Sequence, residues 1–287
     1  MRYEKPETIM EAARLLAGET GVARVLAGGT DLLVQLKSGM VEPDLIVDIK
    51  NLPGMRAIVP EQGGFRIGAA VSGAEFGEHE EVAALWPGVV EGFELIGSTQ
   101  VQGRATMAGN LCNGSPAADS VPGLIAAGAV ARVAGPSGER DCPVEEIPVG
   151  PGRTALLKGE FIASIFLPAR SARSADAYLR FIPRTEMDIA VASAAVNLSL
   201  DVEGAVTAAR VAIGAVAPTV RLVRPAAEAI VGTRLDDDAL ERLGAAASAA
   251  ASPIDDKRGT VEYRVHIVGV LARRAARIAY SRAGGRK

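Results

Sequence analysis

Two turns of small residues interrupt an otherwise regular pattern of predicted helices and strands in this chain. The first, Ala27-Gly28-Gly29-Thr30-Asp31-Leu32, follows a short buried strand predicted at 22–27 and precedes a helix predicted at 32–37. Glycine tolerates positive φ and has no Cβ, so its backbone can approach a ligand closely. Successive N–H groups before a helix can therefore surround a phosphate oxygen, with Thr30 as a further donor. An ordinary Gly-Gly turn without a ligand fits the same residues.

The second turn, Thr106-Met107-Ala108-Gly109-Asn110, belongs to an irregular stretch from 97 to 120 that is rich in Gly, Asn, Ser, Thr and Pro. Long loops of this kind are usually either functional or disordered. The apolar side chains of Met107 and Leu111 argue against disorder. Asp119, near the end of the stretch, has two compatible interpretations: it accepts hydrogen bonds from sugar hydroxyls, or it caps a helix predicted at 121–127.

Together the two turns predict a site for a diphosphate, because such a group needs several aligned donors. Neither turn contains a Lys or an Arg, so we expect backbone amides and helix N-termini to bind most of its charge. The sequence has neither a Gly-x-Gly-x-x-Gly fingerprint between a strand and a helix nor a Gly-Lys-Ser/Thr loop. The turns indicate a dinucleotide, and by themselves they leave FAD and NAD open.

Other sequence features exclude several classes of protein. A net charge of −3 and the lack of a basic stripe with interleaved aromatic residues argue against a nucleic-acid partner. No apolar run approaches about 18 residues and the N-terminus lacks a long apolar segment, so we expect neither a membrane span nor a signal peptide. Cys112 and Cys142 suit neither a disulfide framework nor an iron–sulfur cluster, which favours a cytoplasmic location. His79 and His266 lack neighbouring ligands, so no metal site is predicted, and no catalytic triad or carboxylate pair is found.

The hydrophobic pattern predicts an α+β fold in three pieces, at 1–55, 56–174 and 175–287. In the third piece, β-type runs at 189–200 and 205–216 indicate an antiparallel hairpin. Helical patterns follow at 224–231, 237–250 and 258–280. The last of them and the tail after it carry basic residues that form either a solvated helix face or a docking surface for another subunit: Arg264, Arg273, Arg274, Arg277, Arg282, Arg286 and Lys287.

Several segments resemble the medium, FAD-binding subunits of the xanthine dehydrogenase and carbon monoxide dehydrogenase group. The two turns are similar to the two flavin loops of that family, the second of which is usually Thr-Ile-Gly-Gly-Asn. Ser115–Asp119 is similar to the segment that follows the second loop. Arg184–Ala190 resembles an Arg…Asp-Ile-Ala motif, and Ser252–Arg264 resembles the family's C-terminal signature. These matches span nearly the whole chain in the family's order.

The resemblance implies two α+β subdomains of the PCMH-type FAD-binding fold with FAD between them, then a C-terminal α+β domain with a three-stranded antiparallel sheet and helices. In this comparison the two turns bind the diphosphate, Asp119 binds ribityl or ribose hydroxyls, Ile162 lies against the flavin or adenine, and Arg180 tunes the flavin electrostatically. The cofactor-binding residues implied are Ala27, Gly28, Gly29, Thr30, Asp31, Leu32, Thr106, Ala108, Gly109, Asn110, Ser115, Asp119, Ile162 and Arg180.

Two positions depart from the family pattern. Ala108 replaces the first glycine of the usual pair, so the loop must take negative φ there or shift slightly. Ile189 follows Asp188 where some relatives place an aromatic side chain over the flavin ring, so we expect the ring to be covered differently. Arg184, Glu186 and Asp188 are also compatible with an ordinary surface charge cluster.

The function implied by the resemblance is that of an FAD-containing electron-transfer subunit in a heteromeric molybdenum hydroxylase. The expected partners are a large subunit with a molybdenum cofactor and a small subunit with 2Fe–2S clusters, arranged as a dimer of heterotrimers. Electrons from the clusters would pass through FAD to NAD, oxygen or a quinone-type acceptor. Two alternatives stay open: a self-contained FAD oxidoreductase acting directly on a small molecule, and a non-catalytic scaffold that has lost its flavin.

Overall fold

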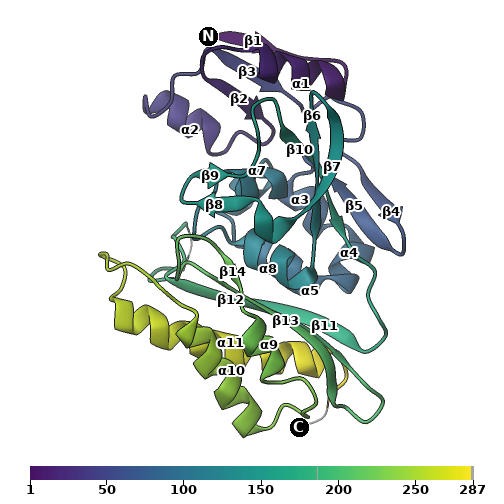
Figure 1. Cartoon of the computed structure of the whole chain (residues 1–287), viewed down its shortest axis with the longest axis vertical. Coiled ribbons are helices and arrows are strands. Elements are labelled where there is room, and N and C mark those ends of the chain that lie inside the picture. Colours follow the sequence, from purple (N-terminus) through teal and green to yellow (C-terminus); the bar gives the residue numbers. More distant parts are fainter. Residues whose placement is uncertain (186, 286–287) are drawn as a thin grey trace.

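The computed structural model describes residues 1–185 and 187–285, so Glu186, Arg286 and Lys287 lie outside the described part. Figure 1 shows an elongated chain in which three main β-sheets follow one another from the N-terminal end to the C-terminal end. Among the described residues, no helix combines the length and the apolarity that crossing a membrane requires.

The first sheet is parallel and has the strand order β1-β3-β2. The predicted helix α2 (Leu32–Lys37) is confirmed at its predicted limits. Helix α1 (Ile9–Gly18) begins after Pro6 rather than at it, because Thr8 caps the helix by accepting a hydrogen bond from the Glu11 amide. The strands are β1 (Arg2–Glu4), which the sequence pattern does not predict, β2 (Ala23–Leu26) and β3 (Leu45–Asp48).

The second sheet is antiparallel and has the order β4-β5-β10-β6-β7. Its strands are β4 (Ile58–Glu61), β5 (Gly64–Gly68), β6 (Val130–Gly135), β7 (Gly138–Pro143) and β10 (Phe161–Leu167). A smaller sheet pairs β8 (Pro148–Gly150) with β9 (Arg153–Thr154). The connection between β5 and β6 contains α3 (Gly73–Gly77), α4 (Glu80–Leu85), α5 (Pro87–Glu94), α6 (Thr99–Gln102), α7 (Met107–Cys112) and α8 (Ser120–Ala127). The expectation of an irregular stretch from 97 to 120 was therefore wrong for α6 and α7.

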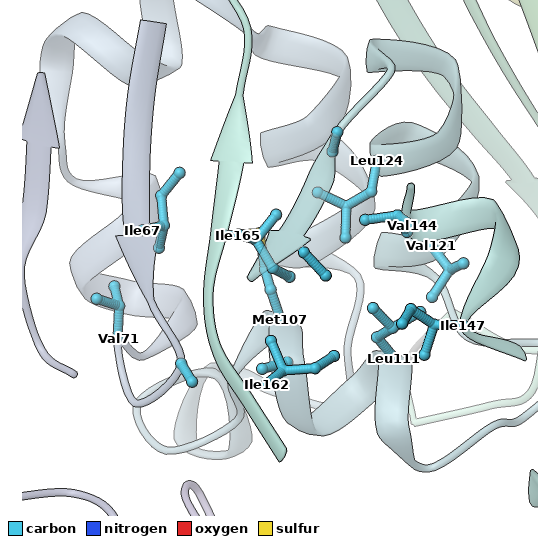
Figure 2. Close-up of a cluster of buried hydrophobic side chains, with 14 of the residues drawn as sticks. Ile67, Val71, Met107, Leu111, Val121, Leu124, Val144, Ile147, Ile162 and Ile165 are labelled. Atoms are coloured by element: carbon cyan, nitrogen blue, oxygen red, sulfur yellow. The ribbon is translucent and has the colours of Figure 1, made fainter. Parts of the chain in front are cut away.

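Burial, more than local sequence, makes α7 helical. Figure 2 shows Met107 and Leu111 of α7 in the same buried cluster as Ile162 and Ile165 of β10. The exposed fractions of Met107 and Leu111 are only 3% and 1%. A helix this short is not stable by itself, so the core must stabilise it. The same core extends to α1 and β3, and it joins the first sheet to the second.

The third sheet is antiparallel, with the order β11-β12-β13-β14. The predicted hairpin is confirmed as β12 (Ala192–Leu200) and β13 (Val206–Gly214), joined by a turn in which the Asp201 carboxylate accepts hydrogen bonds from the amides of Glu203 and Ala205. We expected three strands in this sheet, and it has four. The other two are β11 (Ser174–Phe181) and a two-residue strand, β14 (Arg221–Leu222). The predicted helices follow as α9 (Arg224–Glu228), α10 (Asp237–Ala249) and α11 (Val261–Arg282).

Both faces of the third sheet are buried. Alternate residues of a strand point to opposite faces. Ala194 and Val196 of β12 join a core with α10 and α11, whereas Ala195 joins the core of the first two sheets. Helices α5 and α8 pack on this second face. The C-terminal part of the chain is therefore packed directly against the part that contains the second sheet.

Candidate functional site

A cavity of about 910 Å³ lies between the first sheet, α7 and the segment that leads into β10. Its size is at the upper end of the range of about 300–1,000 Å³ found for ligand and cofactor sites. Residues of both predicted turns line it, together with Ile162: Ala27, Gly28, Gly29, Thr30, Asp31, Leu32, Thr106, Ala108, Gly109 and Asn110.

The first turn contacts the residues on either side of the second turn, at Arg104 and at Asn113. A Cβ atom on Gly28 would collide with the carbonyl oxygen of Arg104, so only glycine allows the two backbones to come this close. Asn113 Nδ2 also donates a hydrogen bond of 3.3 Å to Asp31 Oδ1. Segments far apart in the sequence thus face one common space, as the prediction of a shared diphosphate site requires.

The first turn presents unpaired backbone donors. Within the described part of the chain, no group accepts a hydrogen bond from the N–H of Gly28, Gly29, Thr30 or Asp31. Gly29 has φ +81°, a conformation that L side chains rarely adopt, so the turn depends on glycine at this position too. Burial raises the pKa of the Asp31 carboxyl above its usual range. Consecutive free N–H groups before a helix form a cradle suited to an anion.

The second turn is the N-terminus of helix α7. Thr106 caps it, and its Oγ1 accepts a hydrogen bond of 3.0 Å from the Gly109 amide. The N–H groups of Met107 and Ala108 have no acceptor among the described residues, as expected for the first turn of a helix. Ala108 lies inside α7 and is absent from the positive-φ residues, so alanine fits there without strain. The departure from the family's Gly-Gly pair is thus accommodated by negative φ.

Asn110 connects this turn to the residues behind it. Its Oδ1 accepts hydrogen bonds from Ser120 N at 3.3 Å and from Ser120 Oγ at 2.7 Å. Its Nδ2 has no acceptor in the described residues, and Asn110 lines the cavity. The side chain can therefore donate to a ligand while Ser120 fixes its orientation.

The sequence did not predict two cationic side chains that line the cavity. Arg24 of β2 and Lys158, in the segment before β10, both line the cavity, and neither forms an ion pair within the described residues. They offer positive charge that the two turns lack. The only sequence signal was the Lys158-Gly159 turn directly before the predicted strand 161–167.

Ser115, Asp119 and Arg180 do not line this cavity. Asp119 instead accepts a hydrogen bond of 2.8 Å from the Tyr178 hydroxyl and forms an ion pair of 2.6 Å with Arg180 Nη1. Burial raises the pKa of Asp119 to about 6, against the opposing effects of the Arg180 charge and the Tyr178 hydroxyl. Asp119 is adjacent to Ser120, so this pair lies directly behind Asn110.

The expected capping role of Asp119 was wrong. Asp119 precedes α8, but its backbone is already helical (φ −65°, ψ −34°) and its side chain makes no capping hydrogen bond. The carboxylate is used by Tyr178 and Arg180 of β11 instead, because the third sheet packs against α8. Ser115 likewise has a local role: its Oγ accepts a hydrogen bond of 3.2 Å from the Ala117 amide.

The described residues of the motif at 184–190 do not line the cavity. Arg184 and Asp188 form an ion pair of 2.9 Å, which supports the surface charge cluster for these two residues, and Glu186 lies outside the described residues. Ile189 is 51% exposed and does not line the cavity. His79 precedes α4, where its Nδ1 accepts a hydrogen bond from the Val82 amide. No group of three potential metal ligands occurs in 1–185 or 187–285.

Comparisons with known proteins agree with this geometry. Residues 1–170 match the family described as FAD binding domain in molybdopterin dehydrogenase. Residues 177–279 match the CO dehydrogenase flavoprotein C-terminal domain. The chain is 33% identical to the carbon monoxide dehydrogenase medium chain of Afipia carboxidovorans, over 98% of this chain and 97% of that protein. It is 29% identical to a putative xanthine dehydrogenase FAD-binding subunit of Escherichia coli, over 99% and 97%.

Solved structures of other proteins are also similar to the chain. The chain superposes on carbon monoxide dehydrogenase from Oligotropha carboxidovorans with a TM-score of 0.93 and 32% identity, covering 98% of both chains. Quinoline 2-oxidoreductase from Pseudomonas putida 86 matches with a TM-score of 0.90 and 25% identity, over 99% of this chain and 98% of the other. Nearly all of the chain therefore shares the fold of these proteins.

Proposed function

The chain belongs to the FAD-binding medium subunits of molybdenum hydroxylases related to xanthine dehydrogenase and carbon monoxide dehydrogenase, and on this basis we propose that it carries electrons between partner 2Fe–2S clusters and a terminal acceptor. Its cofactor is FAD, and it is an oxidoreductase subunit. The acceptor in this proposal is NAD, oxygen or a quinone-type molecule.

The FAD diphosphate in our proposal lies against the first turn and the N-terminus of α7. One observation carries this: residues 28–31 and Ala108, whose N–H groups have no acceptor among the described residues, line one cavity of about 910 Å³. Helix N-termini and free amides stabilise phosphate charge. Arg24 and Lys158 add charge from other parts of the wall, and Ile162 offers an apolar contact.

Asn110, Ser115, Asp119 and Arg180 complete the proposed site from one side. Asn110 donates to the cofactor from the wall. Asp119 and Arg180 act behind it, since their ion pair adjoins Ser120, which orients Asn110. Ser115 supports the same segment through its hydrogen bond with the Ala117 amide. This assignment modifies the expectation that Asp119 and Arg180 touch the cofactor directly.

Bound FAD supplies the chemistry that joins one-electron transfer from clusters to two-electron transfer to an acceptor. The chain's own residues bind the cofactor and shield it from water. Two of the titratable lining groups are poorly suited to proton transfer, because burial raises the pKa of Cys112 to about 12 and Glu160 is paired with Arg140 at 2.9 Å. This lining fits an electron carrier better than the alternative, a self-contained oxidoreductase that needs acid and base groups at its own substrate pocket.

The proposal extends to the assembly. We place the chain in the cytoplasm, in a dimer of heterotrimers with a molybdenum-cofactor large subunit and a 2Fe–2S small subunit. Within the chain we propose two FAD-binding subdomains, at 1–55 and 56–174, and a C-terminal domain at 175–287. The first two sheets lie within the first two ranges, and the third sheet lies within the third range except for Ser174, the first residue of β11.

The test is to isolate the chain from its native host under mild conditions. The expected product shows the visible absorption of oxidised flavin, releases FAD on denaturation, co-purifies with two further chains and is reduced only when they and their substrate are present. A yellow chain that oxidises an organic substrate by itself would contradict the electron-carrier proposal. A colourless chain that takes up no added FAD would contradict the cofactor site.

A further inference from the structure

Arg264, at the end of the C-terminal signature, is buried. The sequence placed it with the basic residues of a solvated helix face or docking surface, but its exposed fraction is only 4%. It lies in the first turn of α11, and its side chain turns toward the ends of β12 and β13. A buried guanidinium is costly unless its donors are satisfied, so its contacts indicate what it does.

The guanidinium of Arg264 binds three separate segments. Its Nη1 donates to the carbonyl oxygens of Val191, at 2.8 Å, and Ala215, at 3.2 Å. Its Nη2 forms an ion pair of 2.6 Å with Asp256, within the same signature. Its Nε donates to the carbonyl of Gly259 at 3.4 Å. The planar fork of arginine is suited to such divergent contacts, and the single ammonium group of lysine is not.

One route from Arg264 reaches the residues behind the cavity through Ala215. Ala215 adopts the left-handed conformation (φ +63°), which is uncommon for a residue with a Cβ. In that conformation its N–H donates a hydrogen bond of 2.7 Å to the carbonyl of Pro116. Pro116 belongs to the segment 115–119 that ends at Asp119. Arg264, by binding the Ala215 carbonyl, stabilises the peptide geometry that anchors this segment.

A second route passes through Val191. The Val191 N–H donates a hydrogen bond of 2.8 Å to the carbonyl of Phe181. The neighbouring residue of Phe181 is Arg180, which forms the ion pair with Asp119. Both sets of contacts therefore reach the Asp119–Arg180 pair. Asp119 adjoins Ser120, and Ser120 donates a hydrogen bond to Asn110 at the cavity wall.

We propose that Arg264 is a positioning residue for the cofactor site: through Ala215 and Val191 it holds the Asp119–Arg180 pair, and hence Asn110, in the geometry that binds FAD. This inference rests on the proposed FAD site. It gives the C-terminal signature a role in that site, although no residue of the signature lines the cavity. Removing the guanidinium leaves the buried Val191 carbonyl and the partly buried Ala215 carbonyl without this donor, and it frees the strained Ala215 peptide to relax.

The matched control is Arg170, whose side chain is equally buried. Both side chains are 5% exposed and both form one ion pair with an aspartate. Arg170 contacts Asp176, Asn197 and the carbonyl of Leu85, and none of these residues lines the cavity. The Arg170→Met variant therefore reports the general cost of losing a buried arginine.

The experiment titrates FAD into the flavin-depleted full-length chain for the wild type, Arg264→Met, Arg264→Lys and Arg170→Met. Urea unfolding of the same four proteins measures their stability. We expect about tenfold weaker FAD binding for Arg264→Met, an intermediate loss for Arg264→Lys, and less than about twofold loss for Arg170→Met. If Arg264→Met does not fold, the FAD affinity of Arg264→Lys is compared with that of the wild type instead. The visible flavin spectrum should also shift for the Arg264 variants and not for Arg170→Met.

A double variant tests the route. If Arg264 acts through the Asp119–Arg180 pair, Arg264→Met combined with Asp119→Asn loses less affinity than the product of the two single losses. Wild-type affinity in both Arg264 variants, or equal losses in the Arg264 and Arg170 variants, overturns the inference and leaves the FAD site standing. A wild-type chain that binds no FAD overturns the proposed function itself.

Discussion

Arg180 and Asp119 form a buried ion pair, with 2.6 Å between Nη1 and Oδ2 and side chains that are 5% and 9% exposed. Arg180 Nε is buried and has no hydrogen-bond partner among residues 1–185 and 187–285. The charge of Arg180 is thus compensated mainly by one carboxylate, which the Tyr178 hydroxyl also contacts. Breaking a buried pair by removing one partner leaves an uncompensated charge, and this makes the pair a sensitive point of the structure.

Replacing Arg180 with methionine should destabilise the chain. We expect a loss of about 1–3 kcal/mol in the free energy of unfolding, because the buried Asp119 carboxyl loses its charged hydrogen-bond donor. Urea unfolding at about pH 7 measures this change. Arg132→Met is the control, since Arg132 pairs with Asp141 at 3.0 Å but both side chains are partly exposed, and it should cost less than about 1 kcal/mol. Similar losses for the two variants would show that burial does not strengthen the Asp119 pair.

The stability contributed by Asp119 should depend on pH in an unusual direction. Its pKa rises from 3.8 in the unfolded reference to about 6 in the folded chain, mainly through burial. The folded state therefore binds the proton more tightly, and the stabilisation by protonation is complete below pH 3.8 and is lost as the pH rises through about 6. The free energy of unfolding of the wild type minus that of Asp119→Asn should fall by up to about 3 kcal/mol over this window. A difference that rises with pH there would contradict the assigned environment.

Gly28 should be irreplaceable because of the backbone that leads into the second turn, not because of its own conformation. In Gly28→Ala the new Cβ meets the Arg104 carbonyl, so the two backbone segments must separate. We expect a destabilisation of about 1–3 kcal/mol and loss of FAD binding. Gly18→Ala is the control, because a Cβ at Gly18 meets none of the described residues within 4 Å. Full FAD occupancy in Gly28→Ala, measured by flavin absorption and FAD titration, would show that the contact between Gly28 and Arg104 is not needed for the site.

Restoring the family's glycine in the second turn should not improve the site. Ala108 is helical and 5% exposed, so Ala108→Gly loses a buried methyl group and increases the flexibility of α7. We expect a loss of about 1 kcal/mol in stability and no gain in FAD affinity. Thermal unfolding and FAD titration of the variant measure both. A marked gain in affinity would mean that alanine at this position does weaken flavin binding, as the lost-flavin scaffold hypothesis supposes.

Elements governed by local pattern could be predicted from the sequence. The strand at 161–167, the helix at 32–37 and the hairpin of β12 and β13 are found where the sequence placed them, because periodicity and turn residues act within a few positions. The glycines at 28 and 29 also predicted a turn that opens a helix, since glycine conformation is a local property.

The tertiary structure alone decided which distant residues meet. Helix α7 exists because the core buries Met107 and Leu111, and Asp119 pairs with Arg180 instead of capping α8 because the third sheet packs on that helix. The burial of Arg264 and the positions of Arg24 and Lys158 on the cavity wall likewise depend on how sheets and helices pack. Such contacts join segments far apart in the chain, so their energy is set by the packing of whole elements, and the neighbouring sequence alone does not specify them.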